Sequence, residues 1–94
     1  MKESAVQKKI IDYLHSIGAW TVKTIQCNKA GVPDILCCYK GKFVALEVKR
    51  DMYAKMNETS ELQQRTIKQI IAAAGGVAGV VTCVTEVKEL LDGI

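Results

Sequence analysis

The sequence of 94 residues is poor in aromatic side chains, which make up 5% of it, so Ile, Val, Leu and Ala must build the core. It has one histidine, His15, and none of its four cysteines forms a C-x-x-C pair, which argues against a zinc finger. It also lacks an apolar run long enough to cross a bilayer, and no secretory leader is visible at its start. We therefore expect free structural thiols and a cytoplasmic protein.

The residues that are present favour one folded domain covering residues 1–94. Hydrophobic residues make up 49% of the chain, which is typical of a globular protein rather than a disordered one. The formal net charge of +3 permits nucleic-acid binding but does not demand it. No internal repeat or interdomain linker is visible.

Hydrophobic periodicity and turn residues predict seven elements in the order α-β-β-β-α-β-α. The predicted segments are a helix over Glu3–Ile17, strands over Trp20–Ile25, Asp34–Tyr39 and Lys42–Lys49, a helix from its N-cap Ser60 to Gly75, a fully buried strand over Val77–Val84, and a helix over Glu86–Asp92 capped by Thr85. Two segments, Gln26–Pro33 and Arg50–Thr59, are expected to be loops. The first three strands should form an antiparallel meander, and the fourth should run parallel to the third.

The helix after Ser60 carries two further signals. Ser60 and Gln63 have the spacing of a capping box, in which each side chain accepts a hydrogen bond from the backbone of the other residue. An apolar stripe at helical spacing is expected to be buried, and it consists of Leu62, Thr66, Ile67, Ile70, Ile71 and Ala74.

A two-residue turn at Lys40-Gly41 fixes the register of the predicted hairpin. Tyr39 then pairs with Lys42, so that the numbers of paired residues sum to 81 and Asp34 faces Glu47. Side chains opposed in this way lie roughly 4.5–5.5 Å apart at Cβ, and two like charges there are destabilising.

A divalent cation between the two carboxylates would explain this arrangement. Lys49 follows Glu47 by two residues and therefore projects from the same face of the strand. Mg²⁺ prefers oxygen ligands and often takes one or two carboxylates, and it activates water and orients phosphate in phosphodiester hydrolysis. A lysine ammonium beside it can stabilise the charge that develops on the phosphate. Asp34, Glu47 and Lys49 therefore predict a metal-dependent phosphodiesterase site.

The same residues carry a resemblance to a known family. Gly31-Val32-Pro33-Asp34 followed by Glu47-Val48-Lys49 resembles the PD-(D/E)xK nuclease motif, and the G-x-P-D spelling with the later Ser60–Gln63 segment resembles the VRR-NUC group in particular. The resemblance extends from Glu3 to Val84. It implies an α/β fold with a restriction-endonuclease-like core, in which helices flank a mixed four-stranded sheet.

The resemblance also implies a role for each motif position. The implied metal ligands for Mg²⁺ or Mn²⁺ are Asp34, Glu47, the Val48 carbonyl and Glu3, and the implied catalytic residues are Asp34, Glu47, Lys49 and Gln63. Three of these residues also have structural explanations: Gln63 as a capping residue, Glu3 as a favourable charge at a helix N-terminus, and Lys49 as a lysine that guards a strand edge.

Stand-alone members of this size resemble phage-encoded homodimers that process branched DNA such as Holliday junctions. We therefore expect a Mg²⁺-dependent DNA endonuclease that acts as a homodimer, in the host cytoplasm if it is phage-encoded, with no small-molecule cofactor. Two alternatives remain: a nuclease-like module that binds nucleic acid without cutting it, and a nuclease directed at RNA.

Several side chains are candidates for contact with the nucleic-acid backbone, and they are Lys29, Arg50, Tyr53 and Lys55. Phosphate contacts of this kind position a duplex without reading its sequence. Trp20 is expected either in the core or at a dimer interface.

Overall fold

The computed structural model describes residues 1–94 and contains the predicted elements with one addition. The helices are α1 (Glu3–Ser16), α2 (Met52–Asn57), α3 (Glu61–Ala72) and α4 (Val84–Leu91), and the strands are β1 (Trp20–Lys23), β2 (Ile35–Tyr39), β3 (Lys42–Val48) and β4 (Val77–Val81). The α/β class and the mixed four-stranded sheet are confirmed. None of the helices is both long and apolar enough to cross a membrane.

The sheet has the strand order β1-β2-β3-β4, with antiparallel pairing up to β3 and a parallel β4. Lys40 and Gly41 both have positive φ angles, 50° and 78°, as a type I′ hairpin turn requires. The turn sets the predicted register, because Tyr39 pairs with Lys42 and Ile35 pairs with Leu46. The hairpin arithmetic is therefore confirmed along the whole of β2.

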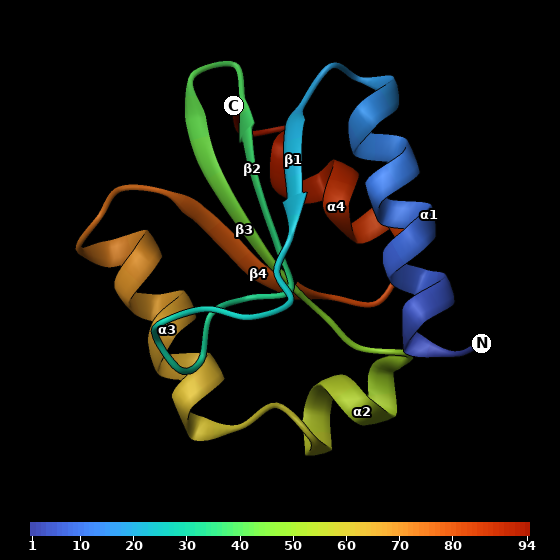
Figure 1. Ribbon diagram of the computed structural model, residues 1–94, viewed down its shortest axis with the longest axis vertical. Coiled ribbons are helices and arrows are strands. Elements are labelled where there is room, and N and C mark those ends of the chain that lie inside the picture. Colours follow the sequence, from blue (N-terminus) through green and yellow to red (C-terminus); the bar gives the residue numbers. More distant parts are fainter.

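One face of the sheet carries the core. Helices α1 and α4 lie together on this face, and α3 lies on the other (Figure 1). The side chains that meet there are aliphatic except for the Cys37 thiol, and the most buried of them are Ile10, Leu14, Ile35, Val44, Leu46, Val48, Val81 and Val87. Burial raises the pKa of the Cys37 thiol to about 11, so this cysteine acts as an apolar core residue.

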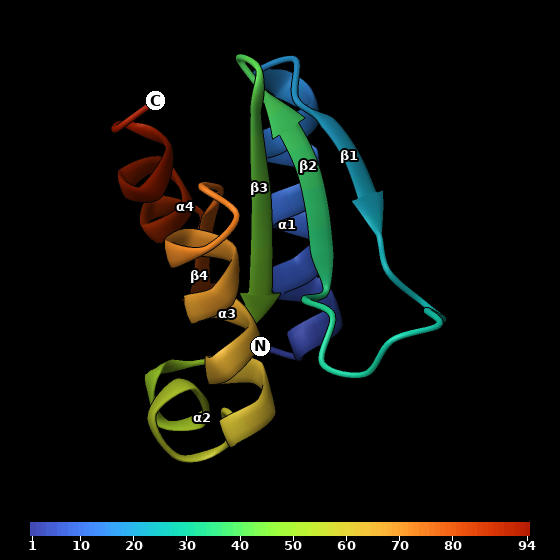
Figure 2. The same ribbon diagram turned by 90° about the vertical axis from the view of Figure 1, so that its left-hand side faces the viewer.

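The opposite face is only partly covered, and two burial predictions are wrong for this reason. Helix α3 packs against β3 and β4 but buries none of its residues fully, and Ile71 stays 49% exposed. Strand β4 is fully buried only at Ala78 and Val81. The part of this face over β1 and β2 has no helix above it, as the side view shows (Figure 2). Trp20 on β1 is 73% exposed and is therefore not a core residue.

Several boundaries differ from the prediction, since β1 ends at Lys23 instead of Ile25 and β4 ends at Val81 instead of Val84. Arg50–Thr59 is not simply a loop, because Asp51 accepts a hydrogen bond from the Ala54 amide at 2.9 Å and caps the six-residue helix α2. Helix α4 begins at Val84 rather than after Thr85. Glu86, in its first turn, accepts hydrogen bonds from the Thr82 amide and hydroxyl, which ties the helix to the end of β4.

Candidate active site

The loop between β1 and β2 delivers Asp34 to the end of the hairpin. Thr24 closes this loop, because its amide donates to the Asp34 carbonyl at 2.9 Å and its hydroxyl donates to the carbonyls of Pro33 and Asp34 at 2.9 and 3.1 Å. Pro33 is buried and has a fixed φ angle. These contacts fix the backbone at Asp34 independently of the contacts that its side chain makes.

Gly31 places the same loop against helix α3. Its φ of 77° lies in the left-handed region, which favours glycine. A Cβ at this position would lie 2.8 Å from Leu62 Cγ and 3.1 Å from Thr66 Oγ1, both on α3. The first residue of the G-x-P-D motif thus permits close packing of loop and helix, and the last residue supplies the carboxylate.

Asp34 and Glu47 lie at the next position of the confirmed register, just beyond the Ile35–Leu46 pair. Asp34 Oδ2 accepts a hydrogen bond from the Val48 amide at 2.9 Å, so the end of β3 fixes the Asp34 side chain. Asp34 therefore reaches across to β3 although β2 itself begins one residue later.

Glu47 and Lys49 are buried side by side on the face of the sheet that α3 partly covers. Glu47 is 4% exposed and Lys49 is 9% exposed, whereas acidic and basic side chains are almost never buried without a partner. Lys49 Nζ lies 3.6 Å from Glu47 Oε2. The alternative explanation of Lys49 as a solvated residue that guards a strand edge does not fit this burial. The backbone amide of Lys49 also donates to the Val81 carbonyl at 3.0 Å, which extends the ladder to β4.

The electrostatics of Glu47 reflect these surroundings. Burial raises its pKa, the negative charge and hydrogen bonding of Asp34 raise it further, and Glu3 adds a smaller effect of the same sign, whereas the Lys49 charge lowers it. The net result raises the pKa of Glu47 from 4.5 to about 7. A buried carboxylate whose pKa is raised by a second carboxylate marks a site suited to an added positive charge.

Gln63 caps helix α3, as predicted, and its side chain also contacts Glu47, while its catalytic role stays a prediction. The Gln63 side-chain Oε1 accepts a hydrogen bond from the Ser60 backbone amide at 3.0 Å, and the Gln63 backbone amide donates to Ser60 Oγ at 3.1 Å, which completes the capping box. Its Nε2 donates to Glu47 Oε2 at 2.9 Å. The start of α3 is thereby attached directly to the carboxylate pair.

The donor set fits a Mg²⁺ or Mn²⁺ ion. Two carboxylates held together, one with a raised pKa, match the ligand preference of Mg²⁺, which usually keeps several waters. Glu3 is half-buried and close enough to raise the Glu47 pKa, but no three acidic, histidine or cysteine side chains form a ligand cluster. The Glu3 and Val48 carbonyl ligands therefore stay predictions.

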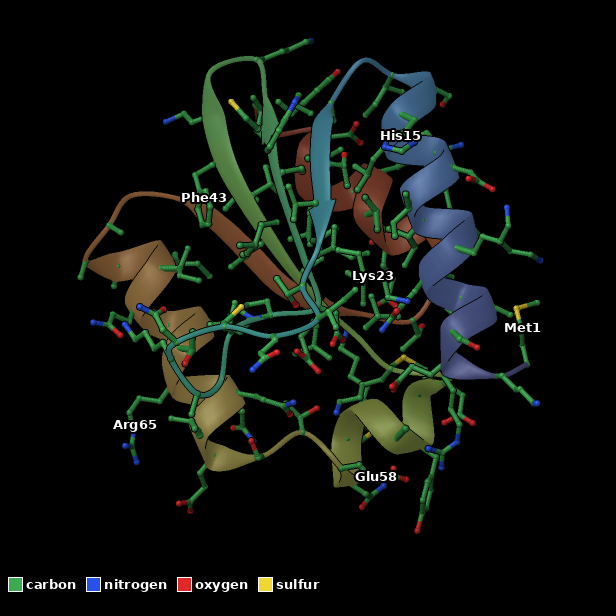
Figure 3. All side chains as sticks on the ribbon, in the orientation of Figure 1. Met1, His15, Lys23, Phe43, Glu58 and Arg65 are labelled. Atoms are coloured by element: carbon green, nitrogen blue, oxygen red, sulfur yellow. The ribbon has the colours of Figure 1, made fainter.

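The candidate nucleic-acid contacts fall into two groups. Arg50 makes a bidentate pair with Glu58 at 2.9 and 2.8 Å, and Lys55 Nζ lies 2.7 Å from Glu86 Oε2. Glu58 lies at the C-terminal end of α2 (Figure 3). These two cations already have acidic partners, which a phosphate would have to displace.

Tyr53 and Lys29 have greater freedom to contact nucleic acid. Tyr53 is 68% exposed on α2. Lys29 is exposed in the loop that leads to Asp34.

The sequence reasoning overlooked one buried polar residue. Gln7 on α1 is 9% exposed, and with Glu47 and Lys49 it completes the set of buried polar or charged side chains. It follows Glu3 by one helical turn, so both residues lie on the same face of α1. That four-residue spacing was the available signal.

Comparisons with known proteins agree with the fold. No family model matches the sequence, and no curated protein matches it. A solved structure described as "VRR_NUC domain" is similar, with a TM-score of 0.78 and 24% identity over 96% of this chain and 94% of the other. The chain has the VRR_NUC fold. The restriction-endonuclease-like architecture implied by the G-x-P-D and E-x-K segments is thereby confirmed, and the VRR_NUC fold here presents Asp34, Glu47, Lys49 and Gln63 at one end of the hairpin.

Proposed function

We propose that this protein is a Mg²⁺-dependent endonuclease that hydrolyses phosphodiester bonds in DNA, with a preference for branched DNA. The observation that carries the proposal is the buried cluster in which Glu47 contacts both Lys49 and Gln63 and lies close enough to Asp34 for that carboxylate to raise the Glu47 pKa. A structural ion pair would need neither the second carboxylate nor an amide that binds the same oxygen. The VRR_NUC fold supports the assignment.

Each side chain has a distinct task in this proposal. The metal ion, held by Asp34 and Glu47, would lower the pKa of bound water and neutralise charge on the phosphate. Asp34 is oriented by the Val48 amide, and Glu47 is oriented by Gln63. Lys49 stabilises the negative charge that develops as the phosphate is attacked. Because Lys49 is buried against Glu47, its ammonium group has little freedom and loses little entropy in this role.

The test is cleavage of a panel of four-way junctions, flaps and duplexes, and of matched RNA, by the wild type and Lys49→Ala. Lys42→Ala is the control, because Lys42 is an exposed lysine at the other end of β3. Loss of an electrostatic stabiliser of this kind costs roughly 10²–10³ in rate. We expect that loss for Lys49→Ala with binding retained on gels, and no loss for Lys42→Ala.

The panel also separates the alternatives. Binding without cleavage by the wild type in Mg²⁺ or Mn²⁺ would identify a non-cutting binding module. Faster cleavage of the RNA strands would identify a ribonuclease. Cleavage that survives Lys49→Ala would refute the role of the lysine.

We also propose that two copies of the chain act together on a junction. A four-way junction has approximate two-fold symmetry, which a C₂ dimer matches with two identical sites. The exposed side chains of Trp20, Val22 and Cys38 surround a small apolar hollow of about 240 Å³ over β1 and β2 and offer a surface for pairing. A monomeric mass in sedimentation at micromolar concentration, with junction cleavage retained, would refute the dimer.

A further inference from the structure

A groove lies on the outer face of the sheet, between the Gln26–Pro33 loop and helix α3. We call it the α3 groove. Its volume is about 370 Å³, within the range of roughly 300–1,000 Å³ that is usual for clefts that hold small ligands. Its apolar walls are formed by Val32 and Pro33 of the loop, Leu36 and Phe43 of the hairpin, Ile70 of α3, and Ala73, which directly follows α3.

The walls of the α3 groove have the chemistry of a nucleobase site. The ring of Phe43 is 47% exposed on β3, on the side of the sheet where α3 lies (Figure 3), and it offers a face for stacking. Thr66 and Gln69 line the groove from α3 and offer hydrogen-bonding groups to the edge of a base. Lys29 stands at the loop side and places a positive charge where a phosphate would follow the base.

The α3 groove is continuous with the candidate active site. Pro33 lines the groove and is bonded to Asp34. Leu36 is two residues from Asp34 on the same strand face, and Phe43 is four residues from Glu47, which corresponds to about 7 and 13 Å along the strands. A base in the groove would therefore belong to a nucleotide roughly two to four positions from the phosphate at the carboxylates, at about 3.4 Å per nucleotide along one strand.

We propose that the α3 groove binds one unpaired nucleobase of the substrate strand, stacked on Phe43, with the adjoining phosphate at Lys29. The inference rests on the proposed nuclease function and deepens it. A base that is still paired and stacked cannot enter a slot between a loop and a helix without leaving the duplex, which is easiest where pairing is already broken. The groove therefore gives a physical reason for a preference for branched or single-stranded DNA.

A second copy of this chain is the competing occupant, and the charges argue against it. The loop side carries Lys29, and the chain as a whole has a net charge of +3, so a second copy would bring more positive charge to the same place. A nucleotide brings one negative charge with each base.

The experiment uses four-way junctions that carry a single abasic site at each position near the branch. Their affinities for the chain of 94 residues are measured in Ca²⁺, and their cleavage is measured in Mg²⁺. Two variants alter the groove: Phe43→Ala removes the stacking ring, and Ala73→Leu fills the slot from α3. Ile71→Ala is the matched control, because Ile71 is exposed on the same helix and does not line the groove. Thermal melting establishes that each variant is folded.

We expect one abasic position to weaken binding of the wild type by roughly five- to 150-fold, the effect of one lost base stack. Phe43→Ala and Ala73→Leu should weaken binding of the intact junction similarly, and neither should weaken it further when that base is missing. Ile71→Ala should bind as the wild type does. This non-additivity identifies the base that occupies the groove.

The two arms separate this inference from the function on which it rests. If the wild type cleaves but no abasic position matters, the base site is wrong and the nuclease assignment stands. If one abasic position weakens binding and no junction is cut, the base site stands and the nuclease assignment fails. If Ala73→Leu halves the sedimentation mass, the groove is a subunit interface and the base site is wrong; Phe43→Ala does not make this distinction, because Phe43 also lines the hollow beside Trp20.

Discussion

The raised pKa of Glu47 predicts an unusual pH dependence of folding stability. In the folded protein the pKa is about 7, against an ordinary value of 4.5, so the folded state binds the proton more tightly than the unfolded state. The free energy of unfolding must then fall as the pH rises from about 4.5 to about 7. Each pKa unit corresponds to roughly 1.4 kcal/mol, so the fall amounts to about 3 kcal/mol.

Glu47→Gln isolates this contribution, because an amide of nearly the same shape has no charge to lose and still offers an oxygen to Gln63. Urea unfolding of both proteins in EDTA, followed by circular dichroism between pH 4.5 and 8, gives the difference in unfolding free energy. We expect this difference to shift by about 3 kcal/mol in favour of the variant as the pH rises. Glu89→Gln, which removes an exposed carboxylate from α4, controls for the loss of one negative charge.

Divalent metal should reverse the trend in the wild type, because a cation at the ionised pair offsets the repulsion. At a hundredfold excess over its dissociation constant, the metal should stabilise the wild type by about 2.7 kcal/mol, or on the order of 10 °C in Tm for a chain of this length. Asp34→Asn should show little of this gain. The reasoning would be refuted if the difference in unfolding free energy between the wild type and Glu47→Gln did not change with pH. It would also be refuted if metal stabilised the wild type and Asp34→Asn equally.

Two further substitutions test the surroundings of the site. Gly31→Ala should lower the unfolding free energy by about 2–4 kcal/mol, because it combines a left-handed φ with a Cβ 2.8 Å from Leu62. Gly18 has a similar φ of 80° in open space, so Gly18→Ala should lower it by only about 1–2 kcal/mol in the same urea titration. Equal losses in the two variants would show that the Gly31 loop moves away from α3 without cost. Lys55→Met should lower the unfolding free energy by less than about 1 kcal/mol, because the Lys55–Glu86 pair is partly exposed. It should also leave the DNA affinity nearly unchanged, since the Lys55 ammonium is already paired. A tenfold loss of affinity on gels would instead show that Lys55 binds phosphate.

The features that could be predicted from the sequence are those set by local geometry. A two-residue turn with two positive φ angles allows one register, so the position of Asp34 opposite Glu47 followed from counting. The capping box at Ser60 and Gln63 followed from spacing alone. The contact of Gln63 with Glu47 did not, because it joins residues on a helix and a strand whose relative placement depends on the packing of the whole domain.

The wrong predictions share a physical cause, which is that periodicity does not reveal how much surface a neighbour covers. The apolar stripe on α3 has helical spacing, but β3, β4 and the Gly31 loop cover only part of it, so Leu62 and Ile71 stay partly exposed. Helix α2 is too short to establish a period, and the Asp51 cap that starts it resembles any acidic residue in a loop. Gln7 lies at helical spacing from Glu3, Ile10 and Leu14, but a polar side chain does not enter an apolar pattern, so its burial was overlooked.

The Gln63 side chain makes two hydrogen bonds, one with Ser60 and one with Glu47, and these explain why an amide rather than an acid occupies this position. A helix start of this type accepts Glu as readily as Gln, since either side chain can receive the hydrogen bond from the Ser60 amide. Only Gln also has an NH₂ group that can donate to Glu47, and Glu would instead bring another negative charge to an acidic pair. Helix α3 alone would therefore accept either residue, and the requirement for glutamine comes from the carboxylates of Asp34 and Glu47, which face the start of α3.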